Sequence, residues 1–240
     1  MKGRSQGFSL IEMMVALALG LVVILGVTQT FIAAKQTYLA QNAAARLQED
    51  ARFALSKIIQ EVRMVGMFGC LSSEAMTYAD PAIAQELVQP ITFSSNADGS
   101  ALTLTLLSGE VGVAGGAPTW TIVTDCVAVA RAYRGAHSAG DGQVALPVRK
   151  LVYTLENDRL LLLQAGDSSK AVLVDNVRAL KVSFGVARHV SDTAVVSYSD
   201  KPDNPATIRS VRLSLTLNDP DGRVRDQAYN VVASLRNRLE

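Results

Sequence analysis

The chain has 240 residues, of which 49% are hydrophobic and 19% are charged. These values exclude a disordered tail and allow one sizeable core or two small ones. The formal net charge of +1 is spread along the chain without long runs of like charge, so we predict no nucleic-acid partner.

The first predicted element is an apolar segment that runs from Phe8 to Ala34, with Glu12 as its only charged residue. A helix of this length spans about 40 Å and can cross a hydrocarbon core of about 30 Å. Lys2 and Arg4 precede it without an acidic residue, so the N-terminus is expected in the cytoplasm and the remaining chain outside it. A secretory signal peptide is the competing interpretation, but the run is too long and lacks a convincing small-residue cleavage site.

The same helix is predicted to continue beyond the membrane, because no proline interrupts the chain before about residue 65. Apolar residues recur there at steps of four or three, the spacing of one helical face. They are Leu39, Ala43, Leu47, Ala51, Ala54, Ile58, Val62 and Val65. The pattern predicts one long helix over residues 8–65, whose apolar stripe packs on a partner.

From Gly66 the sequence changes to short β-type runs separated by turn residues, which predicts a β-rich domain over residues 66–240. The strand candidates are Leu102–Leu107, Thr119–Tyr133, Leu151–Leu155 with Leu160–Leu163, and Leu180–Val186. The strongest hairpin joins Ile208–Leu217 to Arg223–Leu235 through Asn218–Gly222. Loops over 109–118, 134–143 and 197–207 are expected at sheet edges. The predicted fold is α+β, with a long N-terminal helix packed on an antiparallel sheet.

Catalytic and metal-binding patterns are missing from the sequence. There is no nucleophile elbow, Walker loop, H-E-x-x-H or dinucleotide fingerprint. His137 and His189 are isolated, and the Asn218–Asp226 segment fits a hairpin turn better than a calcium loop. We expect a protein that is not an enzyme and that needs no cofactor or metal.

Glu12 is unexpected inside the apolar segment, because a carboxylate at membrane depth costs about 2.5 to 3.5 kcal/mol on insertion scales. Ser9 and Glu12 have the S-x-x-E spacing of a capping box, in which both side chains satisfy free backbone amides at a helix start. The spacing alone leaves both a capping role and a further role open.

The opening residues resemble the class III signal of type IV pilin-like proteins. A short basic leader ends in Gly7, Phe8 follows, and Glu12 stands five places into the mature chain. The resemblance implies that an inner-membrane prepilin peptidase removes residues 1–7 and methylates the new amine of Phe8. The apolar segment, about residues 8–34, would first anchor the chain in inner-membrane lipid and later pack in a filament core. Glu12 would then guide subunit docking.

Two further stretches look like minor pilins of the PilW type. They are VLVDNVRALKVSFGV, Val172–Val186, and the C-terminal VVASLRNR, Val231–Arg238. This resemblance implies a subunit that helps initiate type IV pilus assembly and stays in the tip complex, supporting pilus biogenesis, adhesion and twitching motility. The implied partners are other minor pilins, the major pilin, a tip adhesin and the inner-membrane assembly platform. The globular domain would lie in the periplasm and then at the pilus tip on the cell surface.

Two alternatives remain open from the sequence. A minor pseudopilin of a type II secretion system has a similar build but would push secreted proteins. A membrane-anchored periplasmic binding module belongs to another functional class, and cleavage of the leader at Gly7 would argue against it.

Cys70 and Cys126 are the only cysteines. The predicted topology places them in an oxidising compartment if the host has two membranes, and two cysteines allow a single pairing. A structural disulfide is favoured over free buried thiols.

Overall fold

The computed structural model describes residues 7, 9–72, 75–96, 101–109, 117–164 and 169–235. The other leader residues, the methylation position Phe8 and the Arg236–Arg238 part of the C-terminal resemblance lie outside these ranges.

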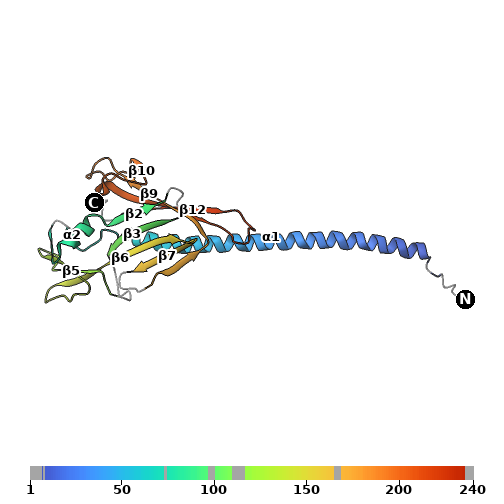
Figure 1. Cartoon of the computed structure of the whole chain (residues 1–240), viewed down its shortest axis with the longest axis horizontal. Helices are drawn as coiled ribbons and strands as arrows, with labels where there is room; N and C mark the ends of the chain where they lie inside the picture. Colours follow the sequence, from blue (N-terminus) through green and yellow to red (C-terminus); the bar gives the residue numbers. More distant parts are fainter. Residues whose placement is uncertain are drawn as a thin grey trace.

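One long helix, α1, runs from Leu10 to Met64 over 55 residues, a length of about 83 Å. Its first half projects from a β-rich domain and its second half lies along that domain (Figure 1). The buried residues of α1 are Ala43, Leu47, Ala51, Ala54, Leu55, Ile58 and Val62. The predicted apolar stripe is therefore confirmed from Ala43 onward. Leu39 is an exception, 36% exposed, because it lies one turn before the point at which the domain begins to cover the helix.

The strands of the described residues form two sheets, and the larger sheet has eight strands. Its strands are β1 (Met76–Tyr78), β2 (Ile91–Ser95), β3 (Leu102–Gly109), β4 (Trp120–Thr124), β5 (Ala130–Arg134), β6 (Val144–Glu156), β7 (Arg159–Gln164) and β8 (Ala171–Asp175). Their order is β1-β5-β4-β6-β3-β2, with β7 pairing β6 and β8 pairing β7. All neighbours are antiparallel except β1 and β5, so the sheet is mixed.

The smaller sheet is antiparallel, in the order β10-β9-β11-β12. It contains β9 (Val177–Val186), β10 (Ser197–Ser199), β11 (Ile208–Leu217) and β12 (Gln227–Ser234), with a short 3-10 turn at Pro205–Thr207. The predicted hairpin is confirmed as β11 and β12, whose register runs from Ser210 opposite Ser234 to Leu217 opposite Gln227. At its turn, Asp219 accepts a hydrogen bond from the backbone N–H of Arg223 at 2.7 Å.

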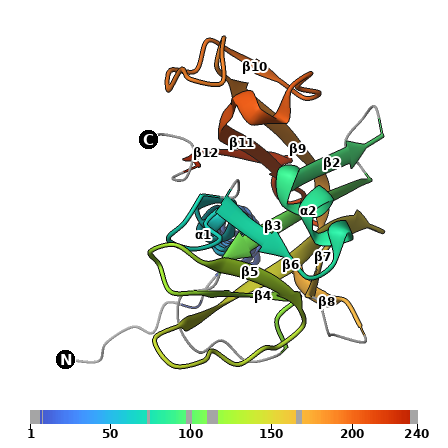
Figure 2. The same ribbon diagram turned by 90° about the vertical axis from the view of Figure 1, so that its left-hand side faces the viewer.

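Helix α1 packs against both sheets. It contacts β3 and β8 of the larger sheet and β11 and β12 of the smaller one, and in the view along the molecule it lies beside them (Figure 2). Ile58 of α1, Leu104 of β3 and Leu213 of β11 are each 0% exposed in this main core. The α+β, pilin-like fold predicted from the sequence is confirmed, but two sheets take the place of the single antiparallel sheet that was expected.

A second, smaller core lies at the end of the domain that is far from the projecting half of α1 (Figure 1). It contains Trp120 and Ile122 of β4, together with Ile83 of a second helix, α2 (Pro81–Val88). The sequence analysis did not predict α2, although Asp80 followed by Pro81 is a common helix start. Asp80 Oδ1 accepts a hydrogen bond from the Ala82 N–H at 2.9 Å and so caps this helix.

The prediction of one strand over Thr119–Tyr133 is wrong, because β4 and β5 form a hairpin in this range. The chain turns at Asp125, whose carboxylate binds three successive backbone amides. The predicted edge loop over 197–207 also contains the short edge strand β10.

Candidate assembly segment

The helix start places Ser9 and Glu12 together. Ser9 is the N-cap of α1, and its backbone N–H donates a hydrogen bond to Glu12 Oε2 at 3.1 Å. The carboxylate also lies in the first turn, where a negative charge is favoured by the helix dipole. Glu12 therefore has a capping role within the chain. It is nevertheless exposed, so a second molecule can still reach it.

Gly7 lies in open space before the helix. A Cβ added to it would meet no atom within 4 Å, so the folded chain itself has room for a larger side chain there. Any requirement for glycine at this position would come from another molecule. The next residue, Phe8, lies outside the described ranges, so the structure gives no distance between its amine and Glu12.

The projecting half of α1 is an apolar surface without a cover. The large side chains from Leu10 to Ile32 are between 48% and 78% exposed. Among the described residues, α1 is the one helix that is long and apolar enough to cross a bilayer, and no residue of its most apolar stretch is buried. Contiguous exposed apolar surface of this extent marks contact with lipid or with other protein.

The domain half of α1 is also fastened by polar contacts. The half-buried Glu61 accepts hydrogen bonds from Lys57 at 2.7 Å and from Ser108 Oγ of β3 at 3.1 Å. Directly after the helix, Val65 forms a bridge to Ser108, so the chain enters the larger sheet at once. The projecting helix is thus continuous with a helix that is firmly packed.

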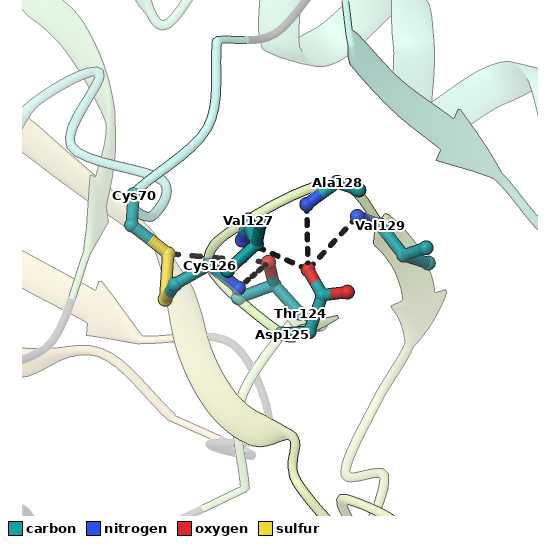
Figure 3. The surroundings of a disulfide bond; sticks show 7 residues. All are labelled: Cys70, Thr124, Asp125, Cys126, Val127, Ala128 and Val129. Atoms are coloured by element: carbon teal, nitrogen blue, oxygen red, sulfur yellow. Dashed lines mark hydrogen bonds between the residues drawn. A yellow bond between two sulfur atoms is a disulfide. The ribbon is translucent and has the colours of Figure 1, made fainter.

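The predicted disulfide between Cys70 and Cys126 is present, with Cα atoms 5.3 Å apart (Figure 3). It ties the chain just beyond α1 to the turn between β4 and β5. Thr124 Oγ1 accepts a hydrogen bond from the Cys126 N–H at 2.9 Å. Cys126 itself has a φ of 60°, a left-handed conformation that is uncommon outside glycine.

Asp125 holds the disulfide turn in shape, which the sequence analysis did not predict. Its Oδ1 accepts hydrogen bonds from the N–H groups of Val127, Ala128 and Val129, each at 2.9 Å (Figure 3). These amides favour the ionised carboxylate and lower the pKa of Asp125 to about 2. An aspartate inside an apparent strand was the signal available in the sequence.

A second polar contact fixes the far end of the domain. Arg134 of β5 donates a hydrogen bond to Asp80 Oδ2 at 2.8 Å, which lowers the pKa of Asp80. Nearby, the ring of His137 stacks on Tyr133 with centroids 3.8 Å apart. Across the described ranges, no three His, Cys, Asp or Glu side chains are grouped as metal ligands.

Comparison with known protein families gives a match at the N-terminus. Residues 2–28 match the family described as the prokaryotic N-terminal methylation motif. No curated protein and no solved structure matches the chain. The matched residues include Gly7, Phe8 and Glu12 and extend into the exposed half of α1. This prepilin-like signal, joined to one exposed apolar helix and a β-rich domain, indicates membrane anchoring and supports a type IV pilin-type or pseudopilin-like protein.

Proposed function

We propose that the protein is a noncatalytic minor pilin that helps initiate type IV pilus assembly and remains in the tip complex. The observation that carries this proposal is the methylation motif at the start of a helix whose projecting half is apolar and exposed. The minor role is supported by the sequence resemblance of Val172–Val186, which in the structure forms β8, β9 and their connection.

The apolar half of α1 would have two successive environments. Before assembly it would lie in inner-membrane lipid, with the β-rich domain in the periplasm. During assembly it would leave the lipid and pack among the helices of other subunits, above the inner-membrane assembly platform. The same exposed side chains serve in both states, because lipid tails and packed helices are both apolar.

Glu12 would set the position of the subunit along the filament. Cleavage after Gly7 gives Phe8 a positive amine near the same apolar layer. An unpaired charge in such a layer is far less stable than a paired and hydrogen-bonded one, so docking is favoured where Glu12 meets the amine of a neighbour. By resemblance, a subunit at the very front often lacks this acid, so we place this protein behind another subunit near the tip adhesin.

The processing test uses the N-terminus of the protein from its host. Mass spectrometry of filament-associated protein should find a chain that begins at methylated Phe8. A Gly7→Glu variant should retain the leader, because a bulky charged side chain would not fit a peptidase pocket that accepts glycine. Gly3→Glu is the matched control, since it adds the same charge within the leader away from the cut, and it should be processed normally. Met1 or Lys2 at the start of the filament-associated chain would contradict the pilin assignment.

A deletion strain distinguishes a minor pilin of a type IV pilus from a pseudopilin of a type II secretion system. Loss of the gene should lower the number of surface pili, and the protein should be recovered with pili sheared from wild-type cells. Normal pili together with a block in protein secretion would instead assign it as a type II secretion pseudopilin.

A further inference from the structure

Helix α1 contains three aromatic residues, and all of them are exposed. The exposed fractions are 68% for Phe31, 65% for Tyr38 and 58% for Phe53. Phe31 belongs to the apolar segment, whereas Phe53 belongs to the half of α1 that packs on the domain.

These three residues share one face of the helix. At about 100° per residue, Tyr38 lies about 20° and Phe53 about 40° from the direction of Phe31. The buried residues Leu47 and Ile58 lie about 160° and 180° away from Phe31. The aromatic face, defined here as Phe31, Tyr38 and Phe53, therefore points away from the domain.

Phe53 is the residue that the membrane does not explain. Aromatic side chains are common where a helix leaves a bilayer, and Phe31 and Tyr38 flank Lys35, the first charge after the apolar segment. Phe53 lies 18 residues, about 27 Å, beyond Lys35 and cannot reach that interface. Beside it the helix surface has a shallow hollow, lined by Glu49, Arg52, Phe53, Ser56, Lys57 and Gln60. Aromatic residues are enriched at the cores of protein interfaces, where they fill pockets of the partner.

The geometry of the face limits what can cover it. Phe31 and Phe53 are about 33 Å apart along a straight helix. Lipid reaches Phe31 but not Phe53, and a soluble protein reaches Phe53 but not the apolar segment. One occupant can cover the whole face only if it also crosses the bilayer and continues outward as an elongated element parallel to α1.

The charges beside the aromatic face disfavour a second copy of this chain. Four cations, Lys35, Arg46, Arg52 and Arg63, lie within about 60° of the direction of Phe31, and Glu49 is the one acid in that sector. Two copies packed in parallel and in register would bring like charges together. A partner with acidic side chains at these levels would instead be attracted.

We infer that the aromatic face of α1 binds the long membrane-spanning helix of a different subunit, which carries acidic side chains opposite Arg46 and Arg52. This inference rests on the proposed function, and it adds a lateral contact that is distinct from the docking of Glu12 with a neighbour's amine.

Photo-crosslinking in the host membrane tests the contact. A photoreactive phenylalanine replaces Phe31 or Phe53 in the full-length chain, and the products are mapped by mass spectrometry. Both positions should join the same second protein, at peptides of its N-terminal helix separated by about 22 residues, as expected for parallel helices. The control is a probe at Gln48, which lies at a similar level on α1 but about 100° around the helix from the direction of Phe31. It should give at least about fivefold less product.

Several results would contradict the inference. Products between two copies of this chain would contradict it, and so would a partner at position 53 that lacks a spanning helix. Different partners at positions 31 and 53, or no protein product at position 53, would also contradict it. Leader cleavage is measured in the same samples. A cleaved chain without the expected products would overturn this inference alone, whereas an uncleaved chain would overturn the proposed function.

A charge variant tests the choice of partner. Arg52→Glu should lower the product from position 53 by at least about fivefold, because it places an acid opposite acids. Arg178→Glu, an exposed change on β9, is the matched control and should leave the yield unchanged. An Arg52→Glu chain that crosslinks as well as the unchanged one would contradict the charge complementarity.

Discussion

Glu12 combines a role inside the chain with a proposed role between chains. Its carboxylate accepts a hydrogen bond from Ser9, and this contact requires an acceptor oxygen but not a charge. Docking with a positive amine requires the charge. The two roles can therefore be separated by choosing the substitution.

Replacing Glu12 by glutamine keeps an acceptor for Ser9 and removes the charge. We expect both Glu12→Gln and Glu12→Ala to be inserted and processed, but to lower surface pili and recovery of the protein with sheared filaments. A reduction of about tenfold would correspond to a loss of 1.4 kcal/mol in docking free energy. If Glu12→Gln retained wild-type pili while Glu12→Ala lost them, Glu12 would be only a helix cap.

Asp125 makes the stability of the far end of the domain depend on pH. Its pKa is about 2 in the folded chain because three backbone amides bind the carboxylate, and an unfolded aspartate has a pKa of about 3.9. A lowered pKa stabilises the fold above the unfolded value, and this contribution is lost as the pH falls from about 4 to about 2.

Asp125→Asn should therefore destabilise the protein at pH 7, and the difference from the unchanged chain should shrink toward pH 2. The asparagine oxygen can still accept from the three amides, so the turn keeps its shape. Thermal unfolding of the full chain in detergent between pH 7 and pH 2 gives the measurement. Asp141→Asn in the next loop is the control. If the difference in unfolding temperature between wild type and Asp125→Asn stayed constant down to pH 2, Asp125 would not titrate as described.

At the scale of elements, the two faces of α1 differ sharply in their contribution to folding. Ile58 is 0% exposed in the main core, whereas Phe53, five residues earlier, is 58% exposed on the opposite side. Both are large apolar residues on one helix, so they form a matched pair.

Ile58→Ala should lower the free energy of unfolding by about 2 to 5 kcal/mol, because it removes buried methyl groups and leaves a cavity between α1 and the sheets. Phe53→Ala should change it by less than about 0.5 kcal/mol. Urea unfolding of the detergent-solubilised chain measures both. A large loss for Phe53→Ala would mean that the residue stabilises its own chain, and not a contact with another subunit.

The sequence predicted the elements whose apolar spacing is regular. Helix α1 and the β11–β12 hairpin were found because periods near 3.6 and of 2 reflect burial on one face. The split between β4 and β5 was missed because the turn contains no glycine or proline and depends on Asp125 and on a left-handed Cys126. The division into two sheets was missed because it depends on long-range packing around α1, which local spacing does not encode.

The candidate site shows the same limit. Gly7, Phe8 and Glu12 could be named because they form a short motif with fixed spacing. The aromatic face of α1 could not be assigned, because it becomes visible only when the domain is seen to cover the opposite side of the helix.

At the scale of the whole molecule, the disulfide joins the end of the helix region to the far end of the domain. It closes a loop across a sequence separation of 56 residues. Within that loop lie α2 and strands β1 to β4, which include most of the smaller core.

Removing the bridge by Cys70→Ser with Cys126→Ser should destabilise the domain by up to about 4 kcal/mol, the loop-closure entropy expected for this loop length. Chemical unfolding of the unchanged chain, with and without reductant, and of the double variant measures this difference in the free energy of unfolding. The untreated, denatured protein should not react with a thiol-alkylating reagent until it is reduced. Ready alkylation of both cysteines without reductant would show that the bond does not form in the host.

The position of the Cys70–Cys126 bond also determines how the molecule responds to tension. A force applied to the projecting end of α1 acts along the helix axis, so it loads the packed residues from Ala43 to Val62 in shear and does not peel them away one at a time. If the helix did slip, the chain beyond Met64 would be drawn out to Cys70, where the bond passes the tension on to Cys126. The next 56 residues, about 190 Å of extended chain, would stay locked behind the bond. The intact bond therefore shortens by about 190 Å the length of chain that tension can draw out of the β-rich domain.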